Sequence, residues 1–229
     1  MLKKYSSYQL ATIIALFFHC VGIAGILFID RELFIKATPL NLLLSFALLV
    51  YTQQQKNGPF FIFMVVVMIA GFLSEVIGVN TGLLFGEYAY GRPLGIQLWK
   101  VPLMIGVNWF IIIYCCGIST HTLLLKIVRG SAVSEHATPG LLKAVAVVVD
   151  GATLAVAFDW LMEPVAVKLG YWAWQNGDIP AYNYICWFLI SLLFLGLFHF
   201  FRFDKRNKFA VNLLLIQAMF FLLLATFLD

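Results

Sequence analysis

The sequence predicts an all-α membrane protein: a bundle of about seven transmembrane helices that forms a single transmembrane domain over residues 1–229. Hydrophobic residues make up 62% of the chain and charged residues only 11%, against about 25% charged in soluble domains. Apolar runs of about 20 residues recur, which is the length needed to cross a hydrocarbon core. Because these runs do not alternate polar and apolar residues, helices are expected rather than a barrel.

The apolar runs divide the chain into seven expected spans. The run within residues 1–28 is long and lacks a clear cleavage context, so we expect it to be the first span rather than a signal peptide. Two connections are long and rich in Gly, Pro, Tyr and Trp: residues 80–100 and 163–180. The stretch Asn80-Thr81-Gly82 is typical of a helix exit, followed by a packed turn. The expected spans are 8–28, 38–55, 60–79, 101–127, 140–162, 181–201 and 209–227.

The basic residues predict the orientation in the cell (inner) membrane. Cytoplasmic loops carry an excess of Lys and Arg, and the expected spans place more of them on the N-terminal side. That side holds Lys3, Lys4, Lys56, Lys126, Arg129, Lys143, Arg202, Lys205, Arg206 and Lys208. The other side holds Arg31, Lys36, Arg92, Lys100 and Lys168. We therefore expect a cytoplasmic N-terminus, an external C-terminus and both long loops outside; no nucleic-acid partner is expected, because the cations form no patch.

Several chemistries are disfavoured by what the sequence contains. The four cysteines fall within apolar runs without metal-ligand spacing, which is typical of small buried hydrophobes. The four histidines are scattered, unlike the clusters that bind iron in membrane hydroxylases. The last expected span has no lysine, which retinal proteins require. No metal and no cofactor is expected.

Three carboxylates are the main candidates for chemistry, because ionisable residues within membrane spans are costly. Glu75 lies near the external end of the third expected span. Asp159 and Glu163 lie at the external end of the fifth, four residues apart and so on one helix face. Asn108 and Trp109 lie in the first turns of the fourth expected span, at a similar depth. The simpler alternative is that these carboxylates pair with Arg92 or Lys168 and only anchor the loops.

Two further features help to delimit the site. Asp150 lies nine residues before Asp159, on roughly the opposite helix face, and is left out. An aromatic belt accounts for most of the six tryptophans, although a few can line a pocket, where their π faces would stabilise positive charge.

Several segments, taken in order, resemble the integral-membrane carotenoid hydratase family. They are Gly71-Phe-Leu-Ser-Glu75-Val-Ile-Gly78, Phe85-Gly86-Glu-Tyr88-Ala-Tyr90, Val101-Pro102 followed by Asn108-Trp109, Asp159-Trp-Leu-Met-Glu163-Pro164-Val-Ala, Gly170-Tyr-Trp172-Ala-Trp174, and Ile179-Pro180 leading to Asn183-Tyr-Ile-Cys-Trp187. The resemblance implies addition of water across the terminal 1,2 double bond of an acyclic or monocyclic carotenoid, such as lycopene, γ-carotene or bisanhydrobacterioruberin, to give a tertiary alcohol. It carries over no catalytic assignment of single residues.

The candidate residues are compatible with that chemistry, which needs an acid, a stabilised tertiary carbocation and a placed water, within a lipid bilayer. We expect Asp159 to be the general acid and Glu75 the base that positions water, with Glu163 supporting one of them. Expected substrate-binding residues are Tyr88, Asn108, Trp109, Trp172 and Trp174. Two alternatives remain open: a carotenoid- or isoprenoid-binding membrane protein without catalysis, and a cofactor-free isoprenoid isomerase or cyclase.

Overall fold

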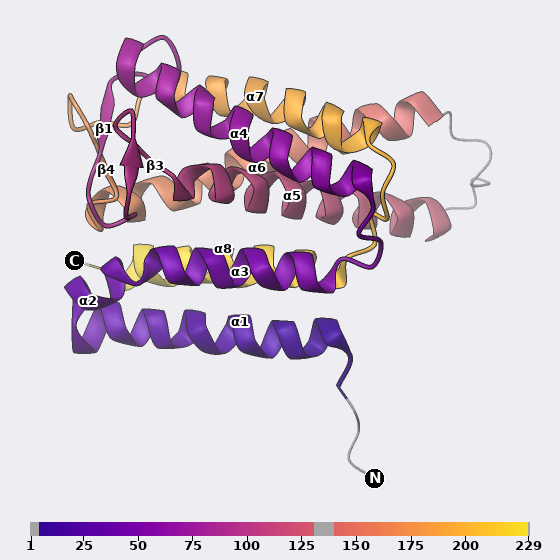
Figure 1. The fold of residues 1–229 in the computed structure, drawn as a ribbon, viewed down its shortest axis with the longest axis horizontal. Coiled ribbons are helices and arrows are strands. Elements are labelled where there is room, and N and C mark those ends of the chain that lie inside the picture. The colour runs from indigo at the N-terminus through magenta and orange to yellow at the C-terminus, as the bar shows by residue number, and fades with distance from the viewer. Residues whose placement is uncertain (1–4, 131–139, 229) are drawn as a thin grey trace.

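The computed structural model describes residues 5–130 and 140–228, and eight α-helices account for most of them (Figure 1). They are α1 (Ser7–Ala24), α2 (Arg31–Lys36), α3 (Thr38–Thr52), α4 (Gly58–Thr81), α5 (Met104–Gly130), α6 (Gly140–Lys168), α7 (Ala181–Phe200) and α8 (Lys208–Phe227). A π-helical turn, Gly25–Ile29, extends α1. Four short strands are β1 (Tyr88–Tyr90), β2 (Gln97–Leu98), β3 (Val101–Pro102) and β4 (Trp172–Trp174). The all-α prediction is confirmed.

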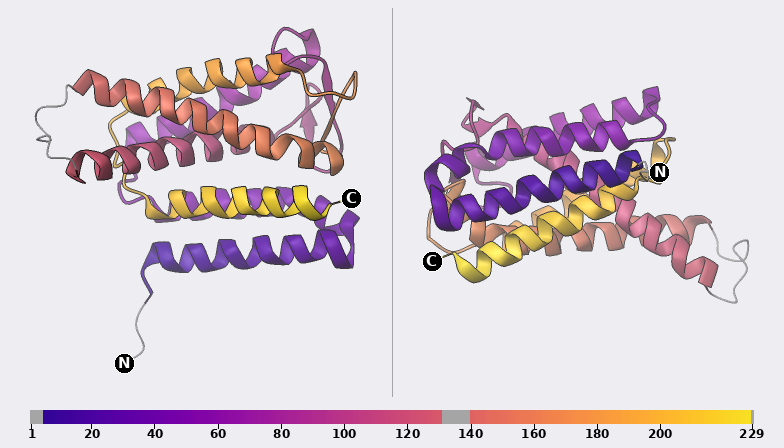
Figure 2. Two further views of the ribbon diagram at one scale, coloured as in Figure 1. Left: turned by 180° about the vertical axis from the view of Figure 1, so that it is seen from behind. Right: turned by 90° about the horizontal axis from the view of Figure 1, so that it is seen from below.

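The long helices lie side by side in layers (Figures 1 and 2). Helix α1 packs on α3 and α8, and these two pack on α5. Helix α5 also contacts α4 and α6, while α6 packs extensively on α7. Helix α5 contacts α3 and α8 and also α4 and α6, so its central part is almost entirely buried. Phe110 and the run from Ile111 to Cys116 are nearly inaccessible. The carboxylate-bearing helices α4 and α6 are therefore held on either side of a common partner.

Among the described residues, six helices are long and apolar enough to cross a membrane, so the chain is a multi-pass membrane protein. The second expected span is a shorter apolar helix: α3 has 15 residues, about 22 Å at 1.5 Å per residue. It nevertheless runs alongside α8 across the bundle (Figure 1). The start of α1 and the end of α8 lie at opposite ends of the bundle (Figure 1). Lys3 and Lys4 lie outside the described residues, as does the Arg129 side chain, and the orientation stays a prediction.

Two of the predicted boundaries that differ from the structure bear on the candidate site. Helix α5 begins at Met104 rather than at residue 101, because Val101–Pro102 forms a strand paired with Gln97–Leu98. Helix α6 continues to Lys168, beyond the expected end at residue 162, although Pro164 removes one backbone donor. Val165 and Ala166 are fully buried, so packing of this last stretch outweighs the cost of the proline. Glu163 consequently lies inside the helix and not at its end.

The two long connections meet through an antiparallel strand pair. Strand β1 pairs with β4 in the register Tyr88↔Trp174, Ala89↔Ala173 and Tyr90↔Trp172. Because side chains alternate along a strand, the four aromatic residues share one face and the two alanines the other. Gly82, in the left-handed conformation at φ 68°, ends α4 where a helix exit was expected. The pair therefore fixes an aromatic layer across one end of the bundle.

Close packing of α4 on α5 depends on Gly106. A Cβ atom at this position would lie 2.5 Å from the Met68 carbonyl oxygen. We expect Gly106→Ala to push the helices apart and to lower the free energy of unfolding by about 1–3 kcal/mol, measured by thermal unfolding in detergent. Gly196→Ala in α7 is the control, since its Cβ would meet nothing within 4 Å. Equal melting temperatures for both variants would contradict the expected clash.

Candidate active site

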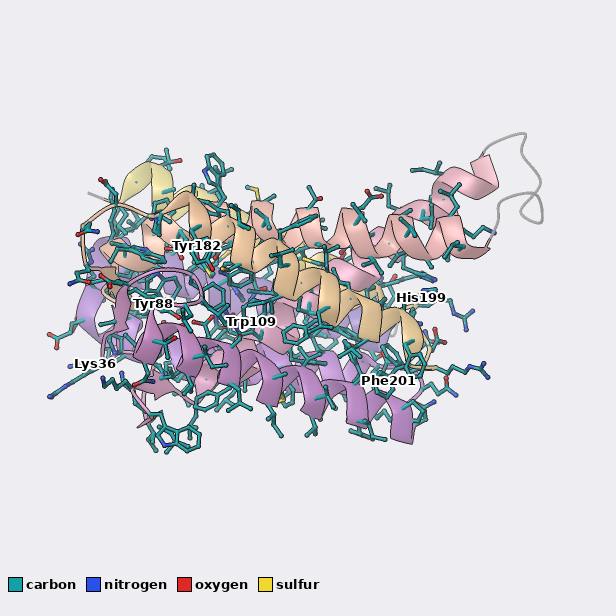
Figure 3. The ribbon with its side chains drawn as sticks, turned by 90° about the horizontal axis from the view of Figure 1, so that it is seen from above. Lys36, Tyr88, Trp109, Tyr182, His199 and Phe201 are labelled. Atoms are coloured by element: carbon teal, nitrogen blue, oxygen red, sulfur yellow. The ribbon has the colours of Figure 1, made fainter. Side chains whose placement is uncertain are left out.

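A small cavity of about 30 Å³ lies beneath the aromatic layer, at the end of the bundle that carries β1 and β4. All the residues predicted for the site line it: Glu75, Tyr88, Asn108, Trp109, Asp159, Glu163, Trp172 and Trp174. Figure 3 places Tyr88 near this end of the bundle and His199 and Phe201 at the other. Helices α4, α5, α6 and α7 each contribute, so the site is built by tertiary packing.

Glu75 projects from α4 and is buried, with 5% of its surface exposed. Its carboxylate accepts hydrogen bonds from three aromatic donors: the Tyr88 hydroxyl, the Tyr90 hydroxyl at 2.8 Å and Trp109 Nε1 at 2.9 Å. Buried polar groups need such partners, and bonds to a charged acceptor are among the stronger ones. The three donors hold the Glu75 carboxyl group in one place and satisfy both of its oxygens.

The two tyrosines can serve Glu75 only while they keep their protons. Burial, followed by the neighbouring Glu75 carboxyl, raises the pKa of both Tyr88 and Tyr90 well above its ordinary value. Both phenols therefore remain O–H donors throughout the range in which a membrane protein is handled.

Asp159 and Glu163 form a second cluster, one helical turn apart on α6 and both buried. Trp172 Nε1 and Trp174 Nε1 donate to Glu163 Oε2 at 2.9 and 3.1 Å. Asn183, in the first turn of α7, donates through Nδ2 to Asp159 Oδ2 at 2.9 Å and approaches Glu163 Oε1 at 3.5 Å. The amide thus fixes the two carboxyl groups relative to each other.

Asp159 differs from the other two carboxyl groups in having a free oxygen. Asp159 Oδ1 is buried and has no hydrogen-bond partner among the described residues, although the residue is completely inaccessible. An unpaired buried acceptor costs roughly 1–3 kcal/mol. A carboxyl oxygen kept free beside a cavity is available to a bound molecule.

The indole of Trp109 is positioned by stacking and by a glycine. Trp187 of α7 stacks on it with ring centroids 4.1 Å apart and planes 17° apart. On the α4 side, a Cβ at Gly71 would lie 2.6 Å from Trp109 Cβ, so only glycine leaves room for this side chain. Trp109 is consequently held between α4 and α7, with its N–H directed at Glu75.

The structure contradicts the alternative in which the three carboxylates form ion pairs with Arg92 or Lys168. The ion pairs among residues 5–130 and 140–228 join Lys36 to Glu32 and Arg206 to Asp204. Arg92 is exposed, and Lys168 Nζ donates to the Leu228 carbonyl oxygen at 2.6 Å. Aromatic N–H and O–H groups therefore take the place expected for cations.

Six residues of the lining were not among the predicted site residues: Phe85, Tyr90, Ile105, Met162, Asn183 and Trp187. Tyr90 lies two residues after Tyr88, and strand alternation would have placed both on one face. Trp187 follows Asn183 by four residues and so lies on the same helix face, which means that finding one of them in the site would have predicted the other. Asp150 is exposed on α6 and does not line the cavity, which agrees with its exclusion.

A wider cleft of about 550 Å³ lies on the other side of the aromatic layer. Tyr88 and Trp174 line both the cleft and the inner cavity, with ring centroids 5.1 Å apart. Polar side chains of Asn80, Thr81 and Gln175 also line the cleft. The two rings are thus a common wall between a polar cleft and the carboxylate cavity.

Among the described residues, no group of three or more His, Cys, Asp or Glu side chains is arranged to hold a metal ion.

Comparison with known families gives a match to the family described as "Carotenoid biosynthesis protein" over residues 37–229. The chain belongs to this carotenoid biosynthesis family. The match includes every residue of the cavity, and the resemblance seen in the sequence is confirmed at the level of the family.

One curated relative of this carotenoid biosynthesis protein is named bisanhydrobacterioruberin hydratase, from Haloarcula japonica. The two are 30% identical over 137 residues, which cover 58% of this chain and 42% of the relative. The chain therefore spans less than half of the relative's length. No solved structure matches the chain.

The donors around Glu75 predict the effect of removing its charge. In Glu75→Gln an amide N–H replaces one acceptor, so at least one of the three aromatic donors loses its partner. We expect the free energy of unfolding to fall by about 1–3 kcal/mol, measured by denaturation in detergent. The exposed Glu87→Gln is the matched control and is expected to be neutral. A Glu75→Gln variant as stable as the control would show that these donors do not depend on the carboxylate.

Proposed function

We propose that this carotenoid biosynthesis protein is a hydratase that adds water across the terminal 1,2 double bond of an acyclic carotenoid end group, giving a tertiary alcohol. The observation that carries the proposal is the free Asp159 oxygen in a buried, water-sized cavity beside a firmly held carboxylate. The name of the Haloarcula japonica relative supports the same reaction class.

In the proposed first step, Asp159 is the general acid. It transfers a proton to the less substituted carbon, C2, and the π electrons form the new C–H bond, leaving a tertiary cation at C1. A carboxylic acid in an apolar site is a suitable donor, because such surroundings favour its neutral form. Asn183 orients the carboxyl group through Oδ2 and leaves Oδ1 for the substrate. Glu163 supports Asp159 through the same amide.

The cation at C1 is stabilised by Glu75 and by aromatic faces. The three donors on Glu75 hold its negative charge in place before the reaction, which is the arrangement that lowers barriers most effectively. Tyr88, Trp109, Trp172 and Trp174 line the cavity and contribute their π faces. Asn108, half-buried in the same lining, contacts the end group.

The second step requires a water beside the cation. A cavity of about 30 Å³ has room for one or two water molecules. In the proposal, the water oxygen bonds to C1 and Glu75 takes its proton; transfer of that proton from Glu75 to Asp159 restores both carboxyl groups and completes the cycle. The polar cleft beyond Tyr88 and Trp174 supplies the water.

The cavity is far smaller than the roughly 300 Å³ or more of a typical ligand pocket, so the end group is accommodated only after side chains move. In the proposal, the side chains that move are Tyr88 and Trp174, because this part of the lining has the inner cavity on one side and the cleft on the other. The predicted orientation places this end of the bundle on the external side, with the N-terminus cytoplasmic. The rest of the carotenoid, a long apolar rod, remains in the lipid bilayer.

Expression in cells that accumulate lycopene or γ-carotene tests the reaction directly. We expect a more polar product heavier by one water, with unchanged visible absorption because the terminal double bond is not conjugated with the chromophore. Mass analysis of extracted pigment is the measurement. A new product of unchanged mass would indicate an isomerase or cyclase instead, and pigment that copurifies unconverted would indicate a binding protein.

Asp159→Asn tests the assignment of the acid. General acid catalysis typically contributes 10²–10⁴-fold, so we expect at least a hundredfold slower conversion while the protein remains folded. Asp150→Asn is the matched control, since it makes the same change on α6 at an exposed position outside the cavity. Conversion by Asp159→Asn at the control rate would contradict the proposed role.

A further inference from the structure

A second, larger cavity lies at the opposite end of the bundle from the carboxylates. It has a volume of about 520 Å³ and lies where α1 and α8 begin and α5 approaches its end. A neighbouring cavity of about 250 Å³ shares Leu125 with it. The proposed hydration reaction uses neither.

Positive charge converges on these cavities. Lys126, Arg206 and Lys208 line the larger one, and Lys143 and Lys205 line the smaller. Lys208 is also the first residue of α8, where the helix terminus adds partial positive charge. Among the described residues, neither lining includes an acidic side chain. The nearby Asp204 is bound by Arg206 at 2.8 and 3.0 Å.

The side chains of Lys126, Arg206 and Lys208 are exposed, and they border apolar surface. Lys208 Nζ lies 5.2 Å from the centre of the Tyr8 ring, and Leu125 and Val211 complete an apolar wall of the larger cavity. In the loop between α7 and α8, burial lowers the pKa of Lys205. A bound anion would compensate the cations that border the larger cavity.

The occupant must combine a negative group with an apolar body. Lys126 and Lys208, together with Arg206 on the same lining, offer positive charge to a phosphate, and the apolar wall suits the glycerol and first methylene groups of a lipid. The cavity also lies at the helix ends, the level of lipid headgroups. Basic pockets between transmembrane helices commonly receive such headgroups.

We propose that the cavity between α1, α5 and α8 is a binding site for the phosphate of an anionic phospholipid. The site is independent of the proposed hydration, so its test uses no carotenoid.

The test is native mass spectrometry of the purified, delipidated full chain with added phosphatidylglycerol, with phosphatidylcholine of the same acyl chains, or with inorganic phosphate. We expect phosphatidylglycerol to be retained preferentially. The double variant Lys126→Gln/Lys208→Gln should bind it roughly 20- to 30-fold more weakly, about fivefold for each cation removed. Arg202→Gln is the control, because Arg202 is exposed at the same end and lines neither cavity. Thermal unfolding in phosphatidylcholine checks that the variants fold.

Three outcomes would overturn the proposal. Equal retention of phosphatidylglycerol by the wild type and the double variant would show that these cations do not bind it. Equal retention of phosphatidylcholine would show that the negative charge is not recognised. Equal protection against unfolding by inorganic phosphate at the same concentration would assign the site to a free anion rather than to a lipid.

Discussion

A carboxylate buried in a membrane bundle must find its hydrogen-bond donors within the protein, because lipid supplies none. In this chain Glu75 and Glu163 obtain them from Tyr88, Tyr90, Trp109, Trp172 and Trp174 rather than from Lys or Arg. Neutral aromatic donors satisfy the oxygens without cancelling the charge, and they cover the site with apolar surface at the same time. The strand pair, the glycine beside Trp109 and the stacked indoles all serve to hold these donors in place.

The same arrangement would meet two demands of the proposed hydration. For that reaction the lining must be apolar enough to accept the substrate, yet it must contain a proton donor and a fixed negative charge. Placing N–H and O–H groups at the edges of aromatic rings meets both demands, since the edge binds the carboxylate and the face remains for the ligand. The arrangement leaves Asp159 as the exception, because its second oxygen has no aromatic partner.

The sequence predicted the features that depend on local periodicity. Apolar runs located the helices, and the four-residue spacing of Asp159 and Glu163 placed both on one face. Helix ends were predicted less accurately than helix positions. The stretch of α6 beyond Pro164 is helical because Val165 and Ala166 are buried, and no local sequence pattern reveals that burial. Asn183 and the pairing of β1 with β4 were not predicted, since each depends on contacts between residues far apart in the chain.

The order of the donors along the chain has a consequence for how the protein is made. The partners of Glu75 follow it by 13, 15 and 34 residues, and those of Glu163 follow by 9 and 11. During synthesis, each glutamate is therefore followed promptly by its own donors, before the next helical hairpin is complete. Each glutamate thus has aromatic donors that are synthesised soon after it, and the pairing of β4 with β1 is one of the later contacts that join the two sets.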